Sequence, residues 1–176
     1  MNQAIDVLRS EHQAIACILK ILQRMANRAR LGTASGTEVG TLLDFLWDFV
    51  EQCHHGKEEG LLFPALRRTC LEQGCELIDE LSAEHRQGGL LMRALRKAVE
   101  PVFDAETFAV TARQYVEFVE RHIAKENAEL FPLAQQILRP DQLDAMQRDF
   151  AAFELKTVGR ERSRQLHEQM RRWRGE

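Results

Sequence analysis

The feature that most constrains the fold is a set of four hydrophobic helix stripes, each interrupted by a histidine. Apolar side chains spaced by three and four residues form one buried face of a helix. The gaps in the four successive stripes fall at His12, His54, His85 and His122. One such histidine is usually a hydrogen-bonded core residue, but one in every stripe predicts a shared polar site inside the protein.

The stripes also predict the fold class, because strand signals are almost absent. Breaks fall in the Gly, Ser and Thr-rich segment 30–40, around Gly74, and at Pro101, after which Asp104 is a suitable N-cap. Four helices joined by short loops favour an all-α, up-down-up-down antiparallel four-helix bundle.

A fifth helix is predicted from Pro140, a favoured residue in a first turn, toward Trp173. We therefore expect a four-helix bundle over residues 1–138 and a C-terminal helical extension over residues 139–176. The end of this extension is basic, and we expect a solvated helix that folds back on the bundle. The alternative is a docking surface for a partner or for a second copy in a homo-oligomer, with His167 on its surface.

Composition points to an ordinary globular protein. The chain has 176 residues and a formal net charge of -3, so no nucleic-acid partner is expected. The N-terminus is charged and lacks the apolar region of a signal peptide, and no apolar run reaches the roughly 18 residues of a membrane span. We expect a cytoplasmic protein with no membrane association. Four cysteines without a CxxC pair are expected to be reduced thiols: Cys17, Cys53, Cys70 and Cys75.

Two of the four helices add a glutamate one turn after the histidine. This spacing places both side chains on one helix face, with their Cβ atoms about 5–6 Å apart. Burying six polar groups together costs several kcal/mol unless a metal satisfies them. The candidate ligands of a dinuclear metal site are His12, His54, Glu58, His85, His122 and Glu126.

An internal repeat supports this set. "CHHGKEEGLLFPAL" at 53–66 and "RHIAKENAELFPLA" at 121–134 agree at six of fourteen positions, and "EH" at 11–12 recurs at 84–85. The repeat predicts two halves related by a pseudo-twofold axis. His55 and Glu59 fall opposite Ile123 and Asn127. We therefore expect His55 outside the ligand set, either behind a ligand or at the surface, and Glu59 in solvent. The Phe-Pro prolines, Pro64 and Pro132, are expected to bend or end their helices.

The donor atoms narrow the choice of metal. Four imidazoles and two carboxylates without a thiolate suit iron or manganese, with zinc as the alternative. If both glutamates bridge, each metal receives two nitrogens and two oxygens from the protein. A solvent-derived oxo or hydroxo bridge then leaves a position for a small diatomic ligand.

These residues resemble the hemerythrin-like family, whose HHE cation-binding domains are four-helix bundles that hold a non-haem di-iron centre. The resemblance runs from about His12 to Pro132, and it implies two iron ions held by the six residues given above. The oxygen-carrying hemerythrins have a further histidine where this chain has Gly89, and they end in His-x-x-x-x-Asp where this chain has His122-x-x-x-Glu126. The six-ligand pattern is more similar to bacterial di-iron proteins linked to nitric oxide, oxidative stress and iron–sulfur repair.

Several functions are compatible with this pattern. The first is reversible binding of O2 or NO in sensing or stress response. The second is an enzyme that reduces NO or decomposes peroxide, with Tyr115 as a proton or electron donor, or a protein that donates iron for repair. The third is a regulatory protein that senses a metal. Gly88 and Gly89 either clear space beside the metals or allow close helix packing.

Overall fold

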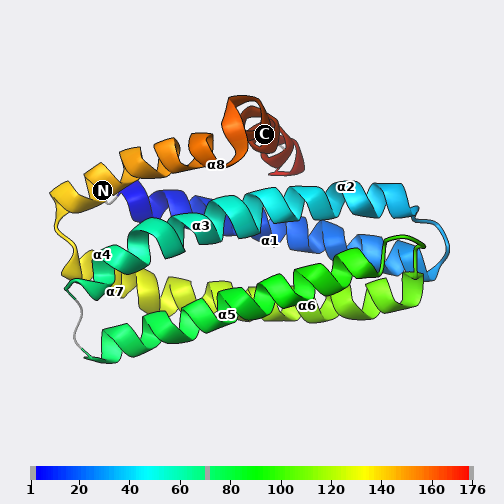
Figure 1. Ribbon diagram of the computed structural model, residues 1–176, viewed down its shortest axis with the longest axis horizontal. Coiled ribbons are helices and arrows are strands. Elements are labelled where there is room, and N and C mark those ends of the chain that lie inside the picture. The colour runs from blue at the N-terminus through cyan, green and yellow to red at the C-terminus, as the bar shows by residue number, and fades with distance from the viewer. Residues whose placement is uncertain (1–2, 70–71, 175–176) are drawn as a thin grey trace.

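The computed structural model describes residues 3–69 and 72–174, and within these residues the chain forms helices and no strand (Figure 1). Helical elements that follow one another without a break form four long rods. The rods are α1 (Gln3–Arg30); α2 (Gly36–Leu46) through α3 (His55–Lys57) to α4 (Phe63–Arg67); α5 (Glu72–Lys97); and α6 (Ala105–Lys125) with α7 (Phe131–Ile137). They run antiparallel, and a further helix covers one side (Figure 1). The predicted all-α bundle with an additional C-terminal helix is confirmed.

Among the described residues the core forms two apolar clusters, one toward each end of the bundle. One cluster includes Leu19, Phe45 and Met92. The other includes Ile5 and Leu66 near the chain's N-terminal end. The histidines that interrupt the stripes lie between the two clusters, so apolar packing encloses them along the rod axis as well as across it.

Three wide π-helical turns lie inside the rods: η1 (Trp47–His54), η2 (Glu58–Leu62) and η3 (Glu126–Leu130). In η2 the N–H of Phe63 donates to the carbonyl of Glu58, and in η3 the N–H of Phe131 donates to that of Glu126. A proline ring clashes with the carbonyl four residues earlier, and the wider turn gives that ring room. The prolines therefore do not end the helices, since both rods continue beyond them.

Some helix boundaries differ from the predictions. The loop after α1 is shorter than expected, because Ser35 and Glu38 form a capping box that starts α2 at Gly36. Gly74 lies inside α5 rather than in a turn. Asp104 caps α6 as predicted, with its carboxylate accepting from the N–H of Thr107 at 3.0 Å.

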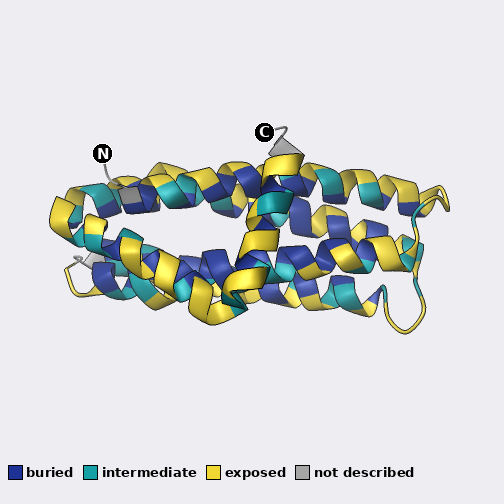
Figure 2. Cartoon of the chain, turned by 90° about the horizontal axis from the view of Figure 1, so that it is seen from above, coloured by how far each residue is buried: buried dark blue, intermediate teal, exposed yellow. Residues whose placement is uncertain are grey.

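The C-terminal helix α8 (Pro140–Arg174) is present as predicted, but it contains a kink at Gly159. The part after the kink turns across the bundle (Figure 2). Leu166 and Met170 are buried, whereas the side chain of Trp173 lies outside the described residues. Because α8 packs along α1, the expectation of a helix folded back on the bundle is confirmed.

One cysteine prediction is wrong. Cys75 is disulfide-bonded, whereas Cys17 and Cys53 are free as expected and Cys70 lies outside the described residues. The lack of a CxxC pair was a poor test, because a fold can bring together cysteines at any spacing. In the part of the chain that the structure describes, no helix has the length and apolar character needed to cross a membrane.

The kink in α8 depends on glycine. Gly159 has φ 78° and ψ 160°, a region of backbone conformation that other residues occupy at a cost of about 1–3 kcal/mol. We expect Gly159→Ala to lower the free energy of unfolding by about this amount, measured by denaturant titration. Gly40→Ala is the control, since Gly40 is helical and a Cβ there meets nothing within 4 Å. It should stabilise by roughly 0.5–1 kcal/mol, and equal effects of the two changes would contradict this account.

Candidate metal centre

The structure brings the six predicted residues together in the middle of the bundle, and all six side chains are buried. They come from all four rods. His12 lies on α1, His54 ends η1, Glu58 begins η2, His85 lies on α5, His122 lies on α6 and Glu126 begins η3. Two of the wide turns therefore begin at the two glutamates.

The donor atoms form two groups of four that share both glutamates. His12 and His54 make one group with Glu58 and Glu126, and His85 and His122 make the other with the same carboxylates. Within each group one atom from every residue lies within 4.8 Å of the others. Such a buried cluster is able to hold metal ions.

The histidine pairs have the spacing of two ligands on one ion. The Nε2 atoms of His12 and His54 are 3.0 Å apart, and those of His85 and His122 are 3.1 Å apart. Two nitrogens that bind one metal at about 2.1 Å and at right angles to each other lie about 3.0 Å apart. Each pair therefore fits around a single cation.

Each glutamate directs one oxygen toward each histidine pair. Oε2 of Glu126 lies 3.1 Å from Nε2 of His12, and its Oε1 lies 3.3 Å from Nε2 of His122. Glu58 places Oε1 at 3.7 Å from His54 and Oε2 at 3.4 Å from His85. Among the described residues none of these four oxygens has a hydrogen-bond partner, although both side chains are fully buried. Buried carboxylates are costly unless a proton on the neighbouring histidines or a cation neutralises them, and the two groups of donor atoms would be able to hold cations.

A second set of residues holds the histidines from outside. Each Nδ1 donates to an oxygen, which directs the opposite nitrogen, Nε2, inward. The acceptors are Glu11 for His54 at 2.9 Å, Glu84 for His122 at 2.8 Å, Glu59 for His85 at 2.9 Å and Asn127 for His12 at 3.1 Å. Glu59 is exposed to solvent as expected, but it also has a structural contact that the sequence did not predict. Its side chain is 43% exposed, yet it also accepts from Ser82.

This outer set explains the internal repeat. Glu11 and Glu84 are the glutamates of the repeated "EH", and each holds the histidine contributed by a neighbouring rod. Glu59 and Asn127 occupy equivalent positions after the two central glutamates. These partners were not predicted, although the repeated "EH" was a signal in the sequence that could have identified two of them.

The repeated phenylalanines cover two of the histidine rings. Phe131 stacks on His12 with ring centroids 5.0 Å apart, and Phe63 stacks on His85 at 5.5 Å. These rings belong to the apolar cluster near the N-terminal end and form the boundary between it and the polar residues.

A family model described as the hemerythrin HHE cation binding domain matches residues 3–134. The chain belongs to the hemerythrin family. No match was found among the curated proteins or among the solved structures. The matched part of this hemerythrin domain contains the whole histidine and glutamate cluster and ends before α8 begins.

Two repeated lysines extend the outer set of this hemerythrin domain. Lys57 donates to Glu11 and Lys125 donates to Glu84. Burial alone would raise the pKa of Glu11, but the hydrogen bond with His54 and the charge of Lys57 outweigh burial and lower it. Glu11 is therefore a carboxylate that can accept from His54.

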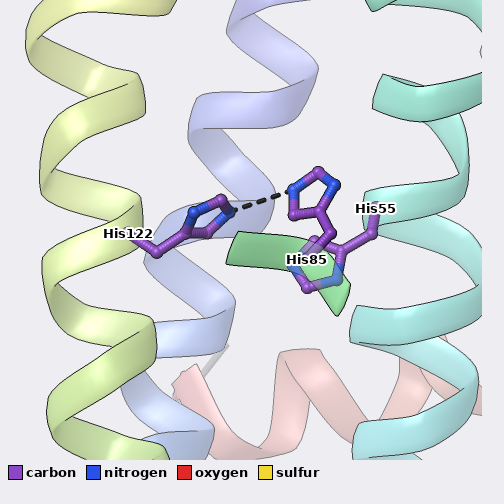
Figure 3. Close-up of side chains that lie close together, drawn as sticks. All are labelled: His55, His85 and His122. Carbon is purple, nitrogen blue, oxygen red and sulfur yellow. Dashed lines mark hydrogen bonds between the residues drawn. The ribbon is translucent and has the colours of Figure 1, made fainter. Parts of the chain in front are cut away.

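His55 is buried rather than at the surface. Its ring stacks on His85 with centroids 4.0 Å apart, and Figure 3 shows it beside His85 and His122. These three histidines form a third close group, which contains no carboxylate. Burial, together with the charge of His85, lowers the pKa of His55 to about 3, so this ring is neutral.

A pocket of about 660 Å³ lies beside the His85 pair, lined by residues that include Trp47, Glu51, His55, His85 and Gly89. Tyr115 does not point at the ligand atoms, because its hydroxyl donates to Glu51 Oε1 at 3.3 Å. A Cβ on Gly88 would meet Phe118 at 3.5 Å and one on Gly89 would meet Arg93 at 3.6 Å, so both positions have only ordinary contacts.

The electrostatics of the cluster predict how stability depends on pH in metal-free protein. Burial alone would lower the pKa values of His85 and His122, but the neighbouring carboxylates outweigh burial and raise them to about 11 and about 9. A raised histidine pKa contributes stability below the unfolded value of about 6.5 and loses it as pH rises through the folded value. As the pH rises from 7 to 9.5, we expect the free energy of unfolding of metal-free protein to decrease by on the order of a few kcal/mol. The thermal midpoint should decrease with it.

The control for this prediction is His122→Gln, which should flatten the decline because glutamine does not titrate. A thermal midpoint that stays constant or rises over this pH range in the parent protein would contradict the electrostatic account.

Proposed function

We propose that the six clustered residues bind two iron ions, and that this centre binds a small diatomic ligand, O2 or NO, in sensing or stress response. The observation that carries the proposal is the division of the cluster into two groups of four that share both glutamates. Each ion would receive two imidazole nitrogens and one oxygen from each carboxylate.

The chemistry of the donors supports iron. Imidazole and carboxylate donors suit iron, manganese or zinc, whereas a thiolate would favour softer metals or clusters. Cys53 is buried beside His54, but burial and nearby carboxylates raise the pKa of its thiol to about 12. It therefore stays protonated and is a poor ligand. Membership of a cation-binding family is consistent with this assignment.

Binding of a small ligand is supported by the number of protein donors and by the pocket. Four protein donors leave coordination positions free on an ion that prefers six, and ferrous iron supplies the affinity for O2 or NO. The pocket beside His85 gives a route to that side of the centre, where Phe63 also stacks on the His85 ring. His55 borders this route and would shape the space for the ligand.

The sharing pattern predicts different metal contents for different substitutions. After anaerobic reconstitution with Fe²⁺, elemental analysis should give about two irons per chain for the parent protein. His12→Ala or His85→Ala should leave about one, because each histidine belongs to one group with the glutamates. Glu126→Gln should weaken both positions, because it belongs to both.

The matched control is His55→Gln, which should keep about two irons because His55 lies outside both groups that contain the glutamates. A parent protein that holds a single ion, or equal losses in all of these variants, would contradict the shared arrangement.

Reversible ligand binding has an optical test. Exposure of the ferrous protein to O2 should produce a charge-transfer absorption band that disappears on deoxygenation. An irreversible change would contradict the binding function. Turnover of NO to N2O, or of peroxide, that is lost in His85→Ala would instead favour the enzymatic alternative.

A further inference from the structure

The C-terminal helix reaches the metal centre through a buried lysine. Lys57 is only 2% exposed, and its Nζ lies 2.5 Å from Oε1 of Glu11 and 3.1 Å from Oε2 of Glu154 on α8. The other oxygen of Glu11 accepts from Nδ1 of His54 at 2.9 Å. An unbroken series of charged contacts therefore joins α8, which lies outside the family match, to a predicted ligand.

The position of Glu154 is fixed by the local structure of α8. Ser163 and His167 donate to its Oε1 at 2.5 and 2.8 Å. Both lie beyond the kink at Gly159, so the kink returns the chain to Glu154. Both carboxylate oxygens of Glu154 are thus occupied, one by Lys57 and one by α8 itself.

Close packing brings α8 against the rod that carries Lys57. A Cβ added to Gly56, next to Lys57, would lie 2.8 Å from the ring of Phe153. A Cβ at this position would force the Phe153 ring to move, so glycine permits the approach. Arg162 adds an ion pair with Asp48 at 2.7 Å. The contact between α8 and this rod therefore depends on residues of both: Gly56 and Asp48 on the rod, and Phe153 and Arg162 on α8.

The internal repeat shows what α8 adds to the first half of the bundle. In the second half, Lys125 donates to Glu84 and also to Glu80, both on α5 within the bundle. The repeated "EH" sets Val7 opposite Glu80, so the first half has no carboxylate at that position. Glu154 supplies from α8 the charge that Val7 cannot supply.

We infer that Glu154 is a positioning residue of the metal centre, completing the His12–His54 half through Lys57 and Glu11. This role rests on the proposed function, and it assigns part of the metal centre to a residue outside the part of the chain that matches the family. Without Glu154, Glu11 is the remaining carboxylate that pairs with the buried Lys57 cation. The stronger interaction of Glu11 with Lys57 then weakens its hydrogen bond with His54. In the other half solvent compensates for such a loss, because the side chain of Lys125 is 23% exposed. The packing of α8 on the bundle thereby affects the metal affinity of the His12–His54 position.

The test is a titration of the full chain with Co²⁺, followed by visible absorption, with a competing chelator to fix the affinities. Loss of a partner of a metal ligand typically costs 10–100-fold in affinity, and Glu154 acts through two links. We expect Glu154→Gln to weaken one of the two positions about 10-fold and the other by less than about twofold. In a His122→Ala background, which leaves the His12–His54 position, the weakening should persist. In a His12→Ala background it should vanish.

A rescue separates positioning from a structural role. Val7→Glu, combined with Glu154→Gln, places a carboxylate at the position equivalent to Glu80, and it should restore the affinity and the Co²⁺ absorption spectrum. Glu80→Gln is the matched control, and it should change affinity by about twofold or less because Glu80 is 59% exposed. Circular dichroism of each metal-free variant verifies that the bundle is folded.

The outcomes distinguish this inference from the proposed function. A parent protein that binds fewer than two Co²⁺ overturns both. A parent that binds two, with Glu154→Gln within twofold at both positions, overturns only the role of Glu154. A weakening that Val7→Glu fails to restore overturns the assignment of that role to the charge on Lys57.

Discussion

The structure depends on the burial of two carboxylates among four imidazoles. Glu58 and Glu126 are fully buried, and none of their four oxygens has a hydrogen-bond partner among the described residues. Such groups are expensive inside a protein unless a cation or a proton neutralises them. The apolar clusters at the two ends of the bundle stabilise the rods, and that packing holds the polar residues in place. The buried cluster is therefore able to hold a metal cation.

Hydrogen bonds between different rods hold the four histidines of the centre. Each inner histidine is held from outside by a residue of another rod, so no rod can rotate without disturbing a ligand on its neighbour. The two halves are not identical, however. One inner histidine is held by the amide of Asn127, whereas its counterpart is held by the carboxylate of Glu59. The pocket and His55 also lie beside His85, so the two histidine pairs have different surroundings.

Helical periodicity was sufficient to predict the bundle and the convergence of the six residues, because a gap in an apolar stripe necessarily faces the core. The outer partners were missed because they lie at the edges of the stripes, where residues such as Glu59 are indistinguishable from solvated ones. The contact between Gly56 and Phe153 joins residues far apart in the sequence, and no local pattern encodes it. The repeated Phe-Pro pairs indicated a disturbance in the helix but not its form as a wide turn.

The most direct test of the central claim is anomalous X-ray diffraction at the iron edge from crystals of the iron-loaded protein. The account predicts two peaks, roughly 3.5–4 Å apart, with one beside each histidine pair and with Glu58 and Glu126 between them. A single peak, or a peak surrounded by His55, His85 and His122 without the glutamates, would contradict it.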